Sequence, residues 1–312
     1  MTTGALQTTG TLRFRKMHGL GNDFVMVDCV RSAVPAGDPA ELARAVCDRR
    51  FGVGADGLIY IEREQGAGAG VGEFRMRMWN PDGSESEMCG NGIRCVARYL
   101  IDEGIVGGRE QGAGVGVGGH GIPVQTGAGL LVVEDAGDGM VRVDMGPAHL
   151  ERGEIGMTGP ADEQFVAQPI EALGQTFSGT AVSMGNPHLV LLMSGADGAA
   201  PSPSIQDIDL AKLGPELEHN ALFPNRTNVH FVQVLNEGHI VQRTWERGAG
   251  ATLACGTGAC ASAVAAFQNR KTGRNVDVDL PGGRLQIEYA EDGHVFMTGP
   301  ATTVYDGEWP LP

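Results

Sequence analysis

Two similar segments carry most of the information about the fold: residues 255–267, CGTGACASAVAAF, and residues 89–100, CGNGIRCVARYL. Both begin Cys-Gly-polar-Gly and then continue with apolar residues at helical spacing. A strand-like segment and a glycine- or acid-rich turn precede each copy, and the two first cysteines are 166 residues apart. The repeat predicts an internal duplication into two similar halves, each with a helix that begins at a cysteine.

Around these copies the chain consists mainly of short apolar segments separated by turns such as PDG, EDG and PGG. Many of them alternate apolar and polar residues, which is typical of antiparallel sheets with one buried face. A further helix is predicted at 38–50, with Asp38 as N-cap and Pro39 in its first turn. We expect strands at 12–19, 23–30, 57–63, 74–80, 129–135, 140–146, 188–194, 228–235, 239–246, 276–280, 284–290 and 294–299.

Composition excludes several classes of protein. The formal net charge of −15 over 312 residues argues against broad nucleic-acid binding. No apolar run approaches the roughly 20 residues that span a bilayer, and the start of the chain lacks the pattern of a signal peptide. We therefore expect a cytoplasmic protein without a membrane partner. Residues 1–10 are expected to be a disordered tail, and the glycine-rich runs at 66–72 and 107–121 flexible surface insertions.

Six cysteines are too few for a disulfide scaffold in a chain of this length. On a helix, Cys255 and Cys260 would point about 140° apart, and Cys89 and Cys95 about 120° apart, so neither pair converges on one ion and no metal site is expected. A disulfide between Cys89 and Cys255 stays open. Four cysteines are expected to be structural thiols: Cys29, Cys47, Cys95 and Cys260.

Cys89 and Cys255 differ because each lies where a loop enters a helix. The unpaired N–H groups and the helix dipole there are predicted to lower the thiol pKa, and the following glycines let the backbone hold a carboxylate. If the halves face each other about a pseudo-twofold axis, one thiolate can remove an α-proton while the other thiol returns a proton to the opposite face. That is racemisation or epimerisation. Pyridoxal phosphate chemistry needs a lysine, and none of the three lysines has a site-like setting, so cofactor-independent chemistry is favoured.

Seven motifs, in order over nearly the whole chain, resemble diaminopimelate epimerase: MHGLGNDFVMVD, RRFGVGADGLIYIE, MWNPDGSESEMCGNGIRC, SMGNPHLVLL, FPNRTNVHFVQV, TWERGAGATLACGTGAC and MTGPATTVYDG. The resemblance implies an α+β fold of two similar domains, each with mostly antiparallel strands wrapped around a central helix. It places one domain at 11–147 plus 300–312 and the other at 148–299. It implies interconversion of LL- and meso-2,6-diaminopimelate, in lysine and peptidoglycan precursor biosynthesis.

The resemblance also implies roles for individual residues. Cys89 and Cys255 are the base and the acid, and His188 and Glu246 tune the pKa values of their thiols. The α-carboxylate would be held by the backbone at Gly90, Asn91, Gly256 and Thr257. The other substrate contacts implied are Asn22, Asn80, Asn186, Asn228, Glu246 and Arg247, and bidentate binding of the distal carboxylate is a physical reason for Arg247.

Two positions depart from the family pattern: Gly57, where many members have Gln, and Ala251, where Glu is common. Other interpretations stay open. The asparagines at 80, 186 and 228 suit turns, a lone His188 is often structural, and Arg247 suits a surface strand end. The rival functions are a racemase for another amino acid, such as proline, and a thiol redox or metal-binding protein. The sequence leaves the oligomeric state open, with a homodimer among the options.

Overall fold

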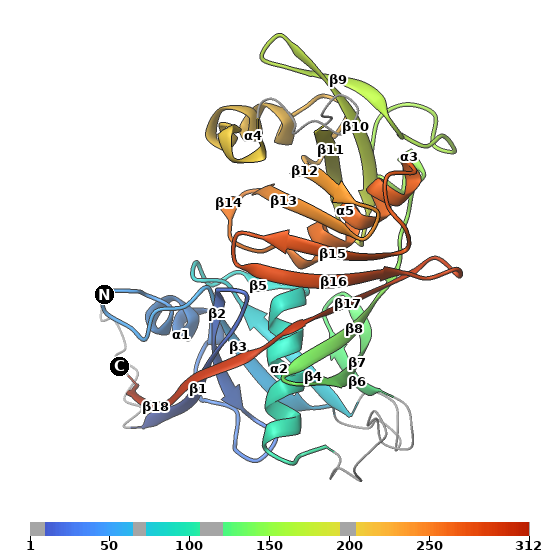
Figure 1. The fold of residues 1–312 in the computed structure, drawn as a ribbon. Coiled ribbons are helices and arrows are strands. Elements are labelled where there is room, and N and C mark those ends of the chain that lie inside the picture. The colour runs from blue at the N-terminus through green and yellow to red at the C-terminus, as the bar shows by residue number, and fades with distance from the viewer. Residues whose placement is uncertain (1–9, 65–72, 107–120, 194–203, 312) are drawn as a thin grey trace, which may run out of the picture. The chain divides into compact units, whose positions relative to one another are not determined.

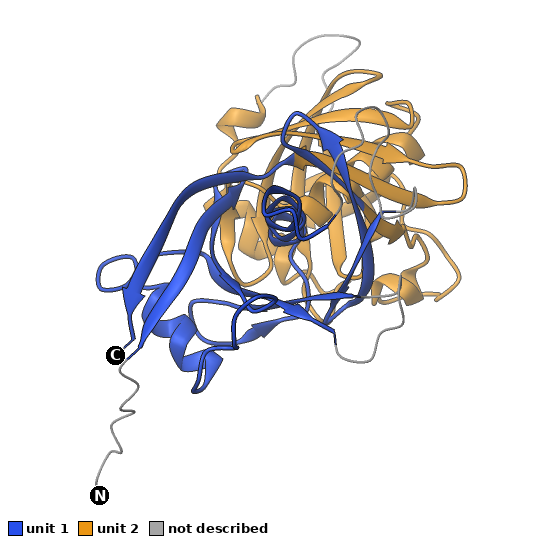
Figure 2. Ribbon diagram, turned by 90° about the horizontal axis from the view of Figure 1, so that it is seen from below, with its two compact units in different colours: residues 1–143, 300–312 blue, residues 144–299 orange. Residues whose placement is uncertain are grey.

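A computed structural model describes residues 10–64, 73–106, 121–193 and 204–311 (Figure 1). The expected tail at 1–10 and the glycine-rich runs at 66–72 and 107–121 lie outside these ranges, apart from Gly10 and Gly121. The chain divides into two compact units, residues 1–143 with 300–312 (unit 1) and residues 144–299 (unit 2), coloured separately in Figure 2. The sequence-based boundaries were 147/148 and 299/300.

Unit 1 contains nine strands and two helices among the described residues. One of these strands, β8, crosses the boundary and leads into unit 2. The elements are β1 (Thr11–Gly19), β2 (Asn22–Asp28), α1 (Pro39–Val46), β3 (Gly57–Arg63), β4 (Phe74–Trp79), β5 (Glu85–Ser86), α2 (Gly90–Asp102), β6 (Ile122–Thr126), β7 (Gly129–Gly137), β8 (Met140–Pro147) and β18 (Thr302–Pro310).

Unit 2 begins within β8 and ends with β17. Its elements are α3 (Arg152–Ile155), β9 (Gln168–Ala172), β10 (Gln175–Ser183), β11 (Pro187–Met193), the 3₁₀ helix η3 (Ile205–Asp207), α4 (Leu210–Glu218), β12 (Asn228–Asn236), β13 (His239–Glu246), β14 (Gly250–Thr252), α5 (Gly256–Gln268), β15 (Asn275–Leu280), β16 (Gly283–Tyr289) and β17 (His294–Pro300).

The two units have the same strand pairing. In unit 1, β1–β2, β3–β4, β4–β5 and β6–β7 are antiparallel, whereas β2–β3 and β4–β6 are parallel. Unit 2 repeats this order and sense from β10 onward: β10–β11, β12–β13, β13–β14 and β15–β16 are antiparallel, and β11–β12 and β13–β15 are parallel. The outer neighbour of β1 is β18, and that of β10 is β9. The duplication predicted from the cysteine repeat is therefore a repeat of topology.

The strand register assigns equivalent residues to the two units. Trp79 pairs with Leu58 and Glu85, as Trp245 pairs with Val229 and Ala251. Phe24 lies opposite Gly57, and His188 lies opposite Asn228. Cys89 and Cys255 are both N-caps, of α2 and α5. Phe24 thus corresponds to His188, Gly57 to Asn228 and Cys89 to Cys255.

Each unit wraps its strands around one of these helices. Figure 2 views α2 nearly end-on with strands of unit 1 around it. The side chains of α5 are almost all small, and ten of its 13 residues are buried, because a helix that is apolar on every side must be enclosed. Separate apolar clusters pack beside them, one around Val25, Leu58 and Trp79 in unit 1 and one around Leu189 and Phe231 in unit 2.

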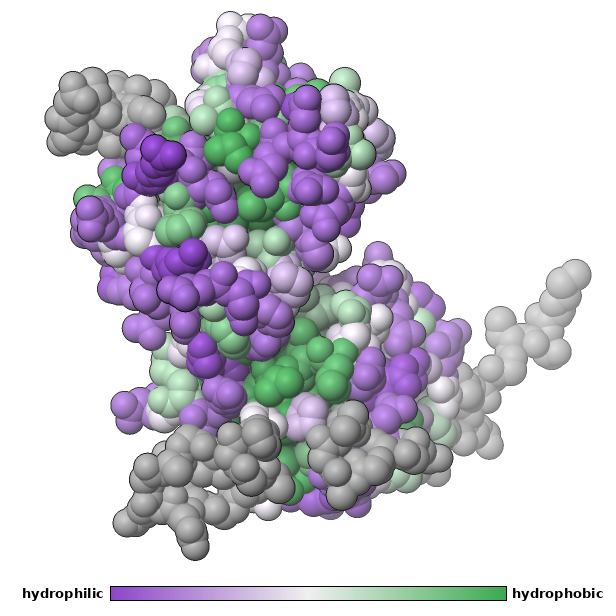
Figure 3. Space-filling model, turned by 90° about the vertical axis from the view of Figure 1, so that its right-hand side faces the viewer, coloured by the Kyte–Doolittle hydropathy of each residue, from purple (hydrophilic) through white to green (hydrophobic). Residues whose placement is uncertain are grey.

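All twelve predicted strands are present, and Asp38 caps α1 through a hydrogen bond to its side chain from Ala40 N. The predicted helix 38–50 is too long, since α1 ends at Val46. The Asp48 carboxylate accepts hydrogen bonds from Arg50 N and Phe51 N, at 2.7 Å each, which turns the chain away. The face drawn in Figure 3 is mostly hydrophilic. No helix of the described residues is long and apolar enough to cross a membrane.

Candidate active site

Cys89 lies at the N-terminus of α2 in an extended conformation, so that its thiol faces the first helical turn. Its Sγ is 3.5 Å from Gly92 N, which donates to it, and 3.7 Å from Asn22 Oδ1. The same Asn22 oxygen accepts a hydrogen bond of 3.1 Å from Asn91 Nδ2. Unit 1 therefore brings together four of the predicted site residues: Asn22, Cys89, Gly90 and Asn91.

An ionic network holds the side chain of Asn22 through the nitrogen that does not face Cys89. Asn22 Nδ2 donates to Asp56 Oδ2 at 2.8 Å, and Arg49 pairs with both Asp56 and Asp23. Burial would raise the pKa of Asp23, but hydrogen bonds from Arg49 and Lys16 outweigh it and lower that pKa to about 2. The Lys16 ammonium is 2.7 Å from Asp23, so the one lysine near a motif is already committed to an ion pair.

Arg94 is a site-supporting residue that the sequence reasoning missed. It is fully buried, and its guanidinium donates to Asn91 Oδ1 at 2.8 Å and to Gly90 O at 3.1 Å. It thereby fixes the two residues that follow Cys89. The signal was present in the sequence, because an arginine three and four residues after these positions lies on their face of a helix.

Asn80 has a different setting. Its backbone N–H donates to Ser84 O at 2.8 Å, and its Nδ2 donates to Ser84 Oγ at 3.0 Å, within the turn that follows β4. These contacts are those of a turn residue, the alternative that the sequence left open. Among the described residues, Asn80 hydrogen-bonds Ser84 and Gly83 of its own turn and not the group around Cys89.

Cys255 of unit 2 is almost completely buried at the N-terminus of α5. Its thiol is 3.7 Å from Thr257 Oγ1, and Gly258 N and the Glu246 carboxylate also act on its pKa. The expectation of a lowered pKa is wrong for this thiol. Burial and the negative charge of Glu246 raise its pKa well above the ordinary value, and the hydrogen bonds from Thr257 and Gly258 do not offset them.

Burial also raises the pKa of Glu246, although the influence of Thr252 and Cys255 opposes the shift. A carboxyl group and a thiol whose pKa values are both raised hold protons more tightly than in water. The raised pKa favours a protonated Cys255 thiol at neutral pH, and the charge of Glu246 contributes to that preference.

His188 is fully buried and uses both ring nitrogens. Nε2 is 2.8 Å from Asn186 Oδ1, and Nδ1 is 2.8 Å from Nε2 of a second buried histidine, His230. Burial lowers the pKa of His188 well below its usual value, with smaller contributions from His230 and Arg247. Burial also lowers the pKa of His230, to about 3. His230 was missed because it lies inside an apolar strand segment, NVHFVQVL, and the motif FPNRTNVHFVQV that contains it assigned it no role.

Asn228 and Arg247 are joined through the backbone. Asn228 Oδ1 accepts from Arg247 N at 3.0 Å, and its Nδ2 donates to Pro187 O at 3.0 Å. The exposed Arg247 side chain donates to Asn225 O at 3.1 Å. The turn around Arg247 is held by the buried carboxylate of Glu218 in α4, which accepts hydrogen bonds from Trp245 Nε1 at 2.8 Å and from Gly248 N at 3.0 Å. Glu218 was not identified from the sequence.

The remaining thiols have the surroundings of structural cysteines. Burial raises the pKa to about 12 for three of them, Cys29, Cys47 and Cys95. Cys95 and Cys260 are fully buried within their helices, as predicted. Across the described ranges no cluster of three or more His, Cys, Asp or Glu side chains could hold a metal ion.

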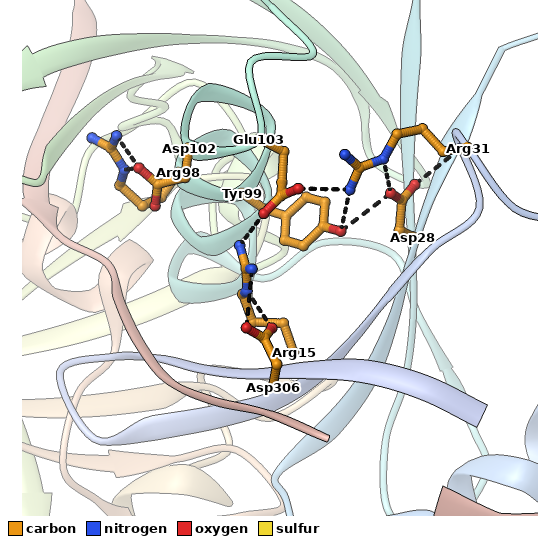
Figure 4. Close-up of polar contacts among 8 residues, drawn as sticks. All are labelled: Arg15, Asp28, Arg31, Arg98, Tyr99, Asp102, Glu103 and Asp306. Atoms are coloured by element: carbon orange, nitrogen blue, oxygen red, sulfur yellow. Dashed lines mark hydrogen bonds and ion pairs between the residues drawn. The ribbon is translucent and has the colours of Figure 1, made fainter. Parts of the chain in front are cut away.

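A pocket of about 870 Å³ lies elsewhere on unit 1, near β1, β2 and β18. Figure 4 shows its ionic lining: Arg15 pairs with Asp306 at 2.7 Å and Glu103 at 2.8 Å, and Arg31 pairs with Glu103 at 2.8 Å. Because both arginines are already ion-paired, these contacts serve to hold the end of α2 against the strands.

A protein-family model described as diaminopimelate epimerase matches residues 14–151 and 180–304. The chain is 48% identical to the diaminopimelate epimerase of Moorella thermoacetica, over 96% of this chain and 100% of that protein. It is 46% identical to the chloroplastic diaminopimelate epimerase of Oryza sativa subsp. japonica, over 95% of this chain and 79% of that protein.

Solved structures share the fold at low sequence identity. A hydroxyproline epimerase from Agrobacterium vitis superposes with a TM-score of 0.64 at 13% identity, over 96% of this chain and 93% of that chain. A phenazine biosynthesis protein from Bacillus anthracis superposes with a TM-score of 0.62 at 14% identity, over 97% of this chain and all of that one. They support the predicted α+β fold with two similar domains.

Proposed function

Because the chain belongs to the diaminopimelate epimerase family, we propose that it interconverts LL- and meso-2,6-diaminopimelate in lysine and peptidoglycan precursor biosynthesis. The observation that carries the chemistry is the equivalence of Cys89 and Cys255. Each is the N-cap of the enclosed helix at the matching place in one of two units with the same topology. A reaction that inverts one carbon needs one proton-transfer group on each face.

In the proposed mechanism one cysteine, as thiolate, removes the α-proton, and the other thiol donates a proton to the opposite face. One proton leaves the α-carbon and one returns to it, so protons balance in each turnover, and the two cysteines end with their protonation states exchanged. The α-carboxylate is held by backbone N–H groups at Gly90, Asn91, Gly256 and Thr257, where the helix N-termini stabilise the charge that develops on it. Glu246 takes the Cys255 proton when that thiol must act as base, and no cofactor takes part.

The distal end of the substrate distinguishes this reaction from a racemase for proline. We assign its amine and carboxylate to Asn80, Asn228, Glu246 and Arg247, and we propose Asn22 and Asn186 as further substrate contacts. Support comes from Asn22, which contacts Cys89, and from Asn228, which is bonded to the backbone of Arg247. Gly57 has no side chain to add a contact, and its equivalent in unit 2 is Asn228. Turnover of diaminopimelate but not of proline is expected.

The test is deuterium incorporation at the α-carbon of diaminopimelate in D₂O. Wild type and Cys29→Ser, a thiol outside the site, should exchange and epimerise, whereas Cys89→Ala and Cys255→Ala should each lose epimerisation. If reduced wild type did not exchange the α-proton of diaminopimelate, the epimerase proposal would be wrong. Epimerisation at the wild-type rate by either alanine variant would leave the reaction intact but remove the two-thiol mechanism.

We further propose a cytoplasmic location and a homodimer. Both thiols must stay reduced to act, and the cytoplasm maintains reduced thiols. Val304 and Tyr305 are large apolar residues side by side on β18 with 54% and 45% of their surfaces exposed, which supports burial against a second copy. Light scattering should give the mass of a dimer for wild type and of a monomer for Tyr305→Glu. A wild-type monomer would contradict the dimer.

A further inference from the structure

Four buried positions are polar in unit 2 and apolar in unit 1. By strand register, His188, His230, Gln242 and Thr244 of unit 2 correspond to Phe24, Ile59, Met76 and Met78 of unit 1. All eight side chains are buried, none with more than 5% of its surface exposed.

The same difference, apolar in unit 1 and polar in unit 2, is found where these strands pack against the central helices. A Cβ on Gly92, the third residue after Cys89, would meet Ile59 Cδ1 at 2.9 Å, and one on Gly258, the third after Cys255, would meet His230 Cε1 at 2.3 Å. Since unit 1 fills these places with apolar groups, the architecture does not require polar ones. Burying polar groups costs stability unless they gain partners, so the unit 2 set calls for a reason beyond packing.

The four polar side chains form one hydrogen-bonded chain, whose direction follows from Gln242. Gln242 Nε2 is 3.2 Å from His230 Nδ1 and 2.8 Å from Thr244 Oγ1. An amide nitrogen can only donate, so His230 Nδ1 is an acceptor. Thr244 Oγ1 lies 3.0 Å from the same Nδ1, and because it accepts from Gln242 Nε2 its own proton is free to point to that nitrogen. Both rings are neutral, since burial lowers both histidine pKa values, and a neutral imidazole carries one proton. The proton of His230 is therefore on Nε2.

The direction then passes along the chain. His230 Nε2–H donates to His188 Nδ1 at 2.8 Å, which leaves the proton of His188 on Nε2. That N–H donates to Asn186 Oδ1 at 2.8 Å. The Asn186 amide is thereby oriented with its oxygen toward His188 and its Nδ2–H donors away from it. With both ring nitrogens used in this way, His188 has no lone pair left to accept a proton.

Turning the Gln242 amide around would reverse every bond in the chain. In the observed orientation Gln242 Oε1 is buried without a hydrogen-bond partner in the described part of the protein. In the reversed orientation the NH₂ group, with two donors, would occupy that unpartnered place. An under-satisfied carbonyl is the less costly of the two, so the observed direction is favoured.

We propose that His230, with Gln242 and Thr244, is a positioning residue that holds His188 in its Nε2–H tautomer and so fixes the amide of Asn186 as a hydrogen-bond donor toward the substrate. The catalytic consequence rests on the proposed function, whereas the tautomers do not. In this role His188 orients Asn186 and does not exchange protons with either thiol.

The tautomers can be measured on the resting protein by ¹⁵N NMR of histidine-labelled samples at neutral pH, because protonated and unprotonated ring nitrogens resonate far apart. Signals are assigned from His188→Phe and His230→Ile, which introduce the residues unit 1 carries. Wild type should show both histidines protonated on Nε2. In His230→Ile, His188 should no longer be confined to that tautomer, whereas His230→Gln, whose NH₂ can replace the lost donor, should restore it.

Kinetics give the second measurement. His230→Ile should lower kcat/KM for diaminopimelate about tenfold, the effect of one oriented hydrogen bond, mainly through KM, and His230→Gln should recover most of it. Protons on Nδ1 of both wild-type rings would overturn the proposal, as would a His230→Ile protein with an unchanged His188 tautomer. Wild type that shows the expected tautomers but no α-proton exchange would contradict the proposed function and leave the chain of hydrogen bonds standing.

Discussion

At the scale of single residues, burial and the neighbouring Glu246 determine the direction of the Cys255 pKa shift more than the helix does. The helix N-terminus favours a thiolate, but burial and the Glu246 carboxylate favour the thiol, and the latter win. A general rule about helix termini predicted the wrong direction because it ignored what occupies the space in front of the helix. The sequence holds Glu246 nine residues before Cys255, and between them the chain folds back in the β13–β14 pair, where Glu246 lies opposite Gly250.

Glu246→Gln should therefore lower the pKa of Cys255, since it removes the negative charge that raises it. At any pH below that pKa a larger fraction of thiolate, and faster alkylation of Cys255 by iodoacetamide, should follow. Mass spectrometry of the Cys255 peptide over a pH series measures the rate, with Glu308→Gln as the control for a remote carboxylate. Slower alkylation in Glu246→Gln than in wild type would contradict the assigned cause of the shift.

At the scale of elements, the sequence missed six strands of the described residues, for different reasons: β5, β6, β9, β10, β14 and β18. β10 is exposed over its first half and buried over its second, so QTFSGTAVS has no period of two. α4 contains Gly214 and Pro215, which argue against a helix, yet Gly214 is needed because a Cβ there would meet Trp245 Cδ2 at 2.3 Å. β18 pairs with β1 from the other end of the chain, which no local pattern reveals.

The equivalent glycines Gly92 and Gly258 provide a matched test of what packs against each helix. Alanine at either place gains helix propensity of about 1 kcal/mol. The added Cβ meets the mobile end of Ile59 in unit 1 but the rigid His230 ring in unit 2. Overpacking costs about 1–3 kcal/mol, so after the propensity gain Gly258→Ala should lower the free energy of unfolding by up to about 2 kcal/mol, whereas Gly92→Ala should not lower it. Guanidinium titrations compare the two, and equal losses would mean that the neighbouring ring is not the cause.

At the scale of the whole molecule, the two buried histidines make stability depend on pH. Their pKa values are lowered on folding, so they stay neutral in the native state below pH 6.5 while the unfolded chain takes up protons. Above about pH 6.5 the two histidines do not lower the free energy of unfolding. As the pH falls below 6.5 toward the folded pKa, about 3 for His230, each histidine lowers the free energy of unfolding by about 1.4 kcal/mol per pH unit. His230→Ile should flatten this slope, measured by denaturant titrations between pH 4 and 7. An unchanged slope would mean that His230 is protonated in the folded protein.

The topological repeat has one break that makes the units unequal. The outer neighbour of β10 is β9, which belongs to the same continuous segment, whereas the outer neighbour of β1 is β18, at the end of the chain. Unit 1 therefore depends on a strand that follows all of unit 2 in the sequence, with eight residue pairs between Thr11↔Pro310 and His18↔Thr302.

Removing residues 302–312 should consequently expose β1 and leave β10 covered. Hydrogen exchange followed by mass spectrometry should show loss of protection at the β1 amides that bond to β18, while β10 and β11 of unit 2 keep theirs. The ion pair of Arg15 with Asp306 is lost as well, so Asp306→Asn in the full chain controls for the charge alone. Equal loss of protection in both units would show that they unfold as one body, and the separate cores around Val25 and Leu189 would then not define independent units.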